Sequence, residues 1–220
     1  MEIINRHIEY YTLETSLLLL CGALIVISKI LFEERFQTFI TLLFSNKYFK
    51  VYGKEVNLNF SLFNVLLFIV QIIIYGFLAQ FVFDYYKLPV SYPLFTIIAS
   101  LGLFVLFKYY FEKLIATIVM AEAFSEQYNF HKVSYRSFIA IIIFPLIALY
   151  IYSPLNSPVL LWTVIFIFLT LNFIAFILTI LNHQKIILPR LFYFILYLCA
   201  LEIAPYVIAI KLVFYNNGLS

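Results

Sequence analysis

Six long apolar runs dominate this chain and limit what it can fold into. A helix needs about 20 consecutive apolar residues to cross a bilayer, and each run reaches or nearly reaches that length. A segment that crosses lipid must satisfy its backbone hydrogen bonds internally, so each run is predicted to be an α-helix. The predicted spans are residues 13–32, 61–83, 93–111, 136–153, 158–181 and 190–214.

The composition excludes a water-soluble fold. Of the 220 residues, 65% are hydrophobic and 11% are charged, whereas a soluble domain has about 45–50% apolar and about 25% charged residues. The mean hydropathy is +1.04. A soluble fold of this size cannot bury so much apolar surface, so the partner that the composition predicts is the lipid bilayer. Because no repeat or linker divides the chain, residues 1–220 are predicted to form one all-α, multi-pass membrane domain.

The distribution of Lys and Arg predicts how the chain is oriented. Eleven of the 14 basic residues lie in three longer connections or at the helix ends beside them, and three lie on the other side. The positive-inside rule then places these connections in the cytoplasm and both termini outside. Lys29 and Lys108, near the inner ends of their helices, are predicted to extend to the lipid headgroups. The start of the chain lacks the features of a signal peptide, so the first run is expected to be retained.

A segment after the first run has the pattern of a helix that lies in the membrane interface. Its apolar residues recur at helical spacing, while Glu33, Glu34 and Arg35 belong to the opposite, polar face. Such a helix either braces the bundle or offers a partner a docking surface. A second stretch, residues 112–128, either extends the third span or also lies flat, and residues 46–60 are predicted to form a loop. The apolar residues of the first segment are Phe32, Phe36, Phe39, Ile40, Leu43 and Phe44.

Glu202 is the most costly residue in the chain, because it lies within the last predicted span. At 1.5 Å per residue it is about 18 Å from the inner end, close to the membrane midplane. Pro205 frees a backbone carbonyl beside it, and Tyr206, Gln71 and Asn172 lie at comparable depth. This cluster predicts a proton or cation relay, or a site for a polar group. The alternative is a structural clip, in which a protonated carboxyl joins helices by hydrogen bonds.

Two further features of the last span concern helix packing. Ala200 and Ala204 form a small-xxx-small pair, which allows another helix to approach closely. Lys211 lies at its outer end, at a depth similar to that of Glu14 on the first span. These opposite charges either pair across two helices or are hydrated separately.

Recognised catalytic motifs are absent. The chain has no H-E-x-x-H, G-x-S-x-G, Walker A or G-x-G-x-x-G sequence. Its three histidines lie outside the predicted spans, and Cys21 and Cys199 are predicted to remain unpaired. We therefore expect no enzyme activity, no metal and no cofactor. The net charge of +3 gives no indication of nucleic-acid binding, and none is expected.

The stretch "RLFYFILYLCALEIAP", residues 190–205, resembles an uncharacterised integral membrane family of Bacteroidota that is catalogued as a domain of unknown function. The resemblance implies a bacterial inner membrane and assigns no activity. Together with the missing motifs, it favours a non-enzymatic subunit or assembly factor of an envelope complex, with other membrane subunits as partners. The alternative is a small transporter or proton-coupled channel that uses Glu202. A lipid-modifying enzyme is third, because no nucleophile or metal site is evident.

Overall fold

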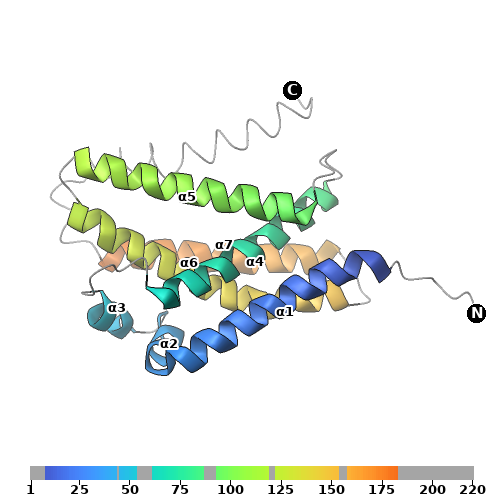
Figure 1. The fold of residues 1–220 in the computed structure, drawn as a ribbon, viewed down its shortest axis with the longest axis horizontal. Helices are drawn as coiled ribbons and strands as arrows, with labels where there is room; N and C mark the ends of the chain where they lie inside the picture. Colours follow the sequence, from blue (N-terminus) through green and yellow to red (C-terminus); the bar gives the residue numbers. More distant parts are fainter. Residues whose placement is uncertain are drawn as a thin grey trace, which may run out of the picture.

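The computed structural model describes residues 8–43, 45–53, 61–86, 93–118, 122–153 and 158–182. All regular structure within these residues is helical (Figure 1). The helices are α1 (Ile8–Leu31), α2 (Glu33–Ile40), α3 (Lys47–Tyr52), α4 (Leu62–Tyr85), α5 (Leu94–Ile118), α6 (Glu122–Tyr152) and α7 (Pro158–Asn182).

Five of the described helices, α1, α4, α5, α6 and α7, are long and apolar enough to cross a membrane. They confirm the predicted fold class and correspond to the first five predicted spans. The chain is thus an all-helical, multi-pass membrane protein. The sixth predicted span, residues 190–214, lies outside the described residues.

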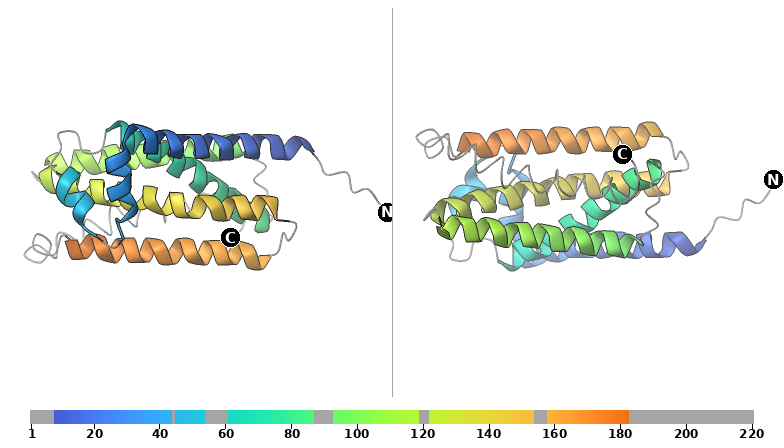
Figure 2. Two further views of the ribbon diagram at one scale, coloured as in Figure 1. Left: turned by 90° about the horizontal axis from the view of Figure 1, so that it is seen from below. Right: turned by 90° about the horizontal axis from the view of Figure 1, so that it is seen from above.

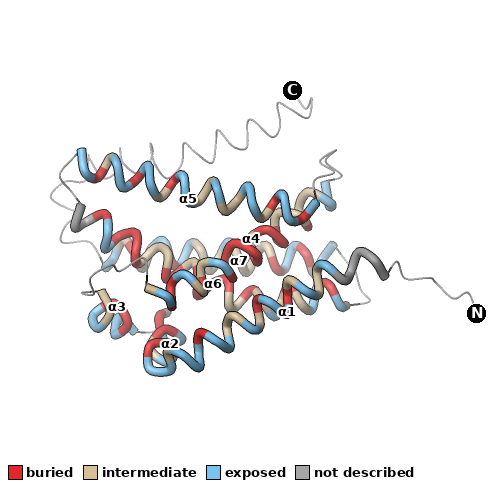
Figure 3. The backbone as a smooth tube through the Cα atoms, in the orientation of Figure 1, coloured by how far each residue is buried: buried red, intermediate tan, exposed pale blue. Residues whose placement is uncertain are grey.

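Helices α4 and α6 form the centre of the bundle. The structure buries 56% of the span of α4 and 50% of that of α6, against 17% in each of α1, α5 and α7. Helix α4 contacts α1, α5, α6 and α7, and α6 also packs on α5 and α7. Figure 2 shows α1, α5, α6 and α7 lying roughly along one direction, with α4 crossing obliquely between them. Figure 3 shows exposed residues along much of α1 and α5. The buried face of α4 repeats at helical spacing through Phe63, Leu67, Val70, Ile74, Phe77 and Phe81.

The short helices α2 and α3 lie at one end of the bundle, where α1 ends and α4 begins (Figure 1). Phe36 and Phe39 of the predicted apolar face are buried there, while Phe32 and Leu43 pack against the core. Ile40 is 51% exposed, so it does not join this packing. The helix ends at Ile40 because the chain turns back toward α3. Phe44 lies outside the described residues.

Arg35 was predicted on the polar face of α2, and this prediction is wrong. The side chain is 7% exposed, and its guanidinium carbon lies 4.7 Å from the ring centroid of Tyr52 and 5.2 Å from that of Phe63. A guanidinium can be buried in this way because its planar, weakly hydrated charge stacks well on aromatic rings. Within the predicted loop of residues 46–60, residues Lys47–Tyr52 form α3 instead, with Gly53 as its C-cap.

The end of α5 answers the alternative for residues 112–118, the described first part of the stretch 112–128. Helix α5 continues without a break to Ile118, so its last turns extend the span rather than lie flat. Helix α6 begins at Glu122, well before the predicted start at residue 136, and continues through Pro145. Its first turns carry many polar residues, which hid the helix in a search for apolar runs.

Candidate functional site

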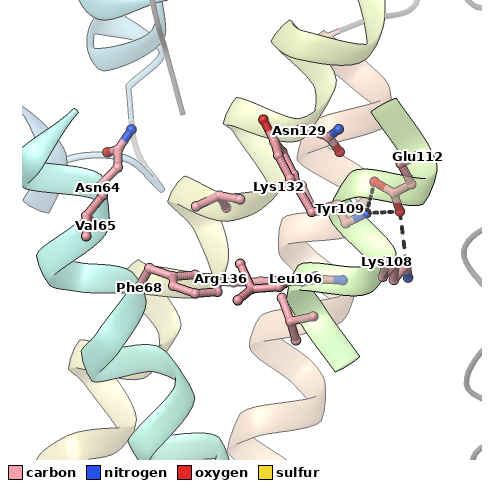
Figure 4. Close-up of a pocket in the computed structure, with 12 residues that line it drawn as sticks. Asn64, Val65, Phe68, Leu106, Lys108, Tyr109, Glu112, Asn129, Lys132 and Arg136 are labelled. Atoms are coloured by element: carbon pink, nitrogen blue, oxygen red, sulfur yellow. Dashed lines mark hydrogen bonds and ion pairs between the residues drawn. The ribbon is translucent and has the colours of Figure 1, made fainter. Parts of the chain in front are cut away.

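The described part of the chain encloses a pocket between α4, α5 and α6, at the end of the bundle that carries α2 and α3 (Figure 4). The cavity measures about 100 Å³. This is enough for several water molecules or a small polar group. Its lining residues are Asn64, Val65, Phe68, Val105, Leu106, Lys108, Tyr109, Glu112, Asn129, Lys132, Val133 and Arg136.

A buried carboxylate organises one wall of the pocket. Glu112 of α5 is 1% exposed, and Lys132 Nζ of α6 donates to both of its carboxylate oxygens, at 2.9 and 3.2 Å. Lys108 Nζ, one turn earlier on α5, lies 3.9 Å from Glu112 Oε1. Figure 4 shows both lysines meeting the same carboxylate. This cluster joins α5 to α6 by charge-assisted contacts.

The lining of the pocket is positively charged overall. Lys108, Lys132 and Arg136 contribute +3 and Glu112 contributes −1, which gives +2. Lys108 is 5% exposed, and the side chain of Lys132 is 11% exposed. Cations held away from water interact strongly with an anion that comes close to them. The chemistry of the lining therefore suits an anionic group.

The pocket lies near one end of the spans, the end that carries α2 and α3. At 1.5 Å per residue, Lys108 is about 21 Å from the start of α5 and Glu112 about 27 Å. Counted back from the end of α6 at Tyr152, Arg136 is about 24 Å away and Lys132 about 30 Å. The hydrocarbon core of a bilayer is about 30 Å thick. By this count Glu112 and Lys132 lie at or near one edge of the hydrocarbon core, and Lys108 and Arg136 lie about 6–9 Å inside it.

The opposite wall of the pocket is apolar and reaches the surface of the bundle. Val65 of α4 and Leu106 of α5 line the pocket, and they are 38% and 43% exposed. Phe68 and Val105 continue this wall on the same two helices and are half-buried. The pocket therefore has a charged interior and an apolar rim on α4 and α5.

The end cap made by α2 and α3 contacts the pocket through a short chain of hydrogen bonds. Arg35 Nε donates to the Tyr48 hydroxyl, which in turn donates to Asn64 Oδ1, and the donor–acceptor distance is 3.4 Å in both hydrogen bonds. Asn64 is 4% exposed, and it lines the pocket. The cap thus holds one polar wall residue in place.

The predicted intramembrane cluster is described only in part. Gln71 is 1% exposed, and its Oε1 accepts a hydrogen bond from Ser137 Oγ at 3.4 Å. Asn172 uses its amide group within α7, where Nδ2 donates to the Phe168 carbonyl. Glu14 is half-buried on α1. Outside the described residues lie Glu202, Pro205, Tyr206, Ala200, Ala204 and Lys211.

The charged cluster was missed in the sequence, where Lys108 was expected to extend to the headgroups. That prediction is wrong, because Glu112 offers Lys108 a closer partner inside the bundle. The sequence signal that could have revealed this cluster is the spacing of charged residues on two helices. Residues four apart share a helix face, and this spacing separates Lys108 from Glu112 and Lys132 from Arg136.

The other reactive side chains within the described residues lie away from the pocket. The ring of His131 stacks on Phe49 of α3, with centroids 3.6 Å apart. Cys21 is a free thiol buried in the hydrophobic core. No three His, Cys, Asp or Glu residues of the described segments form a group that could hold a metal ion.

The fold and the pocket define a multi-pass α-helical membrane protein with a charged cavity near one membrane surface. The sequence matches the family described as Domain of unknown function (DUF4271) over residues 15–213, and the chain belongs to this family. This confirms the family type that residues 190–205 indicated. No curated protein and no solved structure matches the chain.

Proposed function

We propose that the chain is a non-enzymatic membrane protein that binds an anionic group in the pocket between α4, α5 and α6. The observation that carries this proposal is that three cations, Lys108, Lys132 and Arg136, line one pocket with the single carboxylate of Glu112, where Lys108 and Glu112 are buried. Cations in a membrane-embedded site are costly unless they serve a bound group or a structural partner. A net charge of +2 in the lining leaves room for a negatively charged ligand.

The contacts of Glu112 and His131 favour a binding function over a catalytic one. Both oxygens of Glu112 accept hydrogen bonds from Lys132, so this carboxylate is poorly placed to act as a general base. The imidazole of His131 stacks on Phe49 and does not line the pocket. The subunit or assembly role in a bacterial inner-membrane complex is part of this proposal, with the bound group acting as a structural element.

The test is native mass spectrometry of the protein purified in a neutral detergent. We expect the wild type to retain an anionic species, and we expect Arg136→Gln to lose most of it. Lys113→Gln is the matched control, because Lys113 is exposed on α5 and does not line the pocket. Equal retention by all three folded proteins would refute binding in this pocket.

A second candidate function is transport, which is favoured by the buried pair of Gln71 and Ser137. Gln71 follows Asn64 by seven residues, so both lie on one face of α4, about 10 Å apart along the axis. Polar groups thus continue from the pocket toward the middle of the bundle. Proton flux into liposomes, measured with a pH-sensitive dye, should then depend on Glu202. A flux that is unchanged in Glu202→Gln would exclude the relay.

A further inference from the structure

We infer that the anionic group is the headgroup phosphate of an anionic membrane phospholipid, which enters the pocket sideways from the inner leaflet between α4 and α5. This inference rests on the proposed anion-binding function and names its ligand. The pocket combines three features that suit a phospholipid headgroup: cations close to one edge of the hydrocarbon core, an opening toward lipid, and an apolar wall along the path of the acyl chains.

Depth is the first argument. Lys108 and Arg136 lie about 21–24 Å from the outer ends of their helices, and Glu112 and Lys132 about 27–30 Å. In a bilayer with a core about 30 Å thick, Glu112 and Lys132 lie at or near its edge, and Lys108 and Arg136 lie about 6–9 Å inside it, so a phosphate must enter the pocket to reach Arg136. Basic pockets between spanning helices on the cytoplasmic side are suited to anionic headgroups.

Shape is the second argument. Val65 and Leu106, partly exposed at the rim, belong to α4 and α5, so the entrance lies on the flank of the bundle. Phe68 and Val105 continue from the rim on the same helices. A soluble anion gains little from such an apolar wall, whereas the glycerol and upper acyl carbons of a lipid would bury apolar surface against it.

The charge pattern is the third argument. Three cations, Lys108, Lys132 and Arg136, line the pocket with one carboxylate, that of Glu112. Arg136, one turn deeper on α6 than Lys132, supplies a planar guanidinium that binds phosphate oxygens in pairs. Asn64 and Asn129 line the same pocket with neutral amide groups, and Asn129 Nδ2 donates to Ser125 Oγ. Arg136 is therefore assigned as the main phosphate ligand.

The experiment measures the melting temperature of the full chain in neutral detergent with three additions. These are phosphatidylglycerol, phosphatidylcholine at the same mole fraction, and sodium phosphate, with ionic strength matched by sodium chloride. A ligand that binds the folded state well above its Kd raises the melting temperature, here by roughly 5–10 °C. We expect this rise with phosphatidylglycerol alone, less than half of it in Arg136→Gln, and the full rise in Lys113→Gln.

Other outcomes separate the two proposals. If sodium phosphate stabilises the wild type as much as phosphatidylglycerol, and Arg136→Gln removes both effects, a soluble anion is the ligand and the lipid inference is overturned. If no addition has an effect that depends on Arg136, anion binding itself is overturned.

If Arg136→Gln does not fold, Arg136→Lys replaces it. That variant keeps the charge but loses the paired donors, so a full phosphatidylglycerol response would refute Arg136 as the main ligand.

Discussion

Glu112 is the residue on which the charged pocket depends. Its carboxylate compensates Lys132 and Lys108 inside the bundle. Removing one partner of a buried ion pair leaves an uncompensated charge and costs about 3–5 kcal/mol, whereas removing both partners costs much less. We therefore expect Glu112→Gln to lower the melting temperature in detergent strongly, and Glu112→Gln combined with Lys132→Met to recover much of the loss.

The control for this double-mutant cycle is Glu126→Gln, because Glu126 is exposed on α6 at the same end of the bundle. A solvent-exposed carboxylate contributes little, so this variant should melt within about 1–2 °C of the wild type. If the double variant is as unstable as the sum of the two single variants, Glu112 and Lys132 are not coupled. That result would contradict the role assigned to the pair.

The partners of single charged residues could not be predicted from the sequence. Depth along a helix can be counted from the chain, and it suggested that Lys108 extends to the headgroups. Which neighbour a side chain meets depends on how two helices are rotated against each other. Glu112 and Lys132 meet across α5 and α6 although they are 20 positions apart. Arg35 is the same case, since its aromatic partners come from α3 and α4.

At the scale of helices, the contact between α4 and α5 depends on Gly76. A Cβ atom at this position would collide with the side chain of Ile98, whereas at Gly102 it would only touch Ile72, at 3.6 Å. Overpacking at a close helix contact costs about 1–3 kcal/mol. We expect Gly76→Ala to lower the melting temperature, and Ile98→Val in the same chain to restore part of it.

Gly102→Ala is the matched control for that substitution. It adds the same methyl group to α5 at ordinary contact distance, and alanine has the better helix propensity. Its melting temperature should equal or exceed that of the wild type. Should Gly76→Ala prove as stable as Gly102→Ala, then α4 and α5 do not approach as closely as the structure has them. Because the pocket lies between these helices, Gly76→Ala should also weaken the response to phosphatidylglycerol.

The helices themselves were more predictable than their contacts. The thickness of a bilayer sets the length of a spanning helix. The apolar runs therefore located α1, α4, α5 and α7, and most of the predicted ends lie within a few residues of the observed ones. The early part of α6 and the whole of α3 were not found. Their polar residues are typical of loops, and aromatic contacts between the two helices stabilise them, such as those of Tyr48 with Phe130 and of Phe49 with Tyr135.

At the scale of the whole molecule, the function depends on which membrane face carries the pocket. The pocket, α2 and α3 share one end of the bundle, and the excess of basic residues predicts that this end is cytoplasmic. The C-cap of α4 at Tyr86 lies at the other end of that helix, and Tyr86 is 59% exposed. Ser45 is exposed next to α3. These two positions therefore report on opposite faces.

We expect a membrane-impermeant maleimide to label Tyr86→Cys in intact spheroplasts and Ser45→Cys only after the membrane is permeabilised. Both variants carry Cys199→Ser as background, while Cys21 is fully buried and stays unreactive. Equal labelling in detergent would show that both thiols are reachable once the barrier is removed. The reverse pattern would place the pocket in the outer leaflet. An inner-leaflet lipid could then not reach Arg136, and the headgroup inference would have to be abandoned even if the protein binds phosphatidylglycerol in micelles.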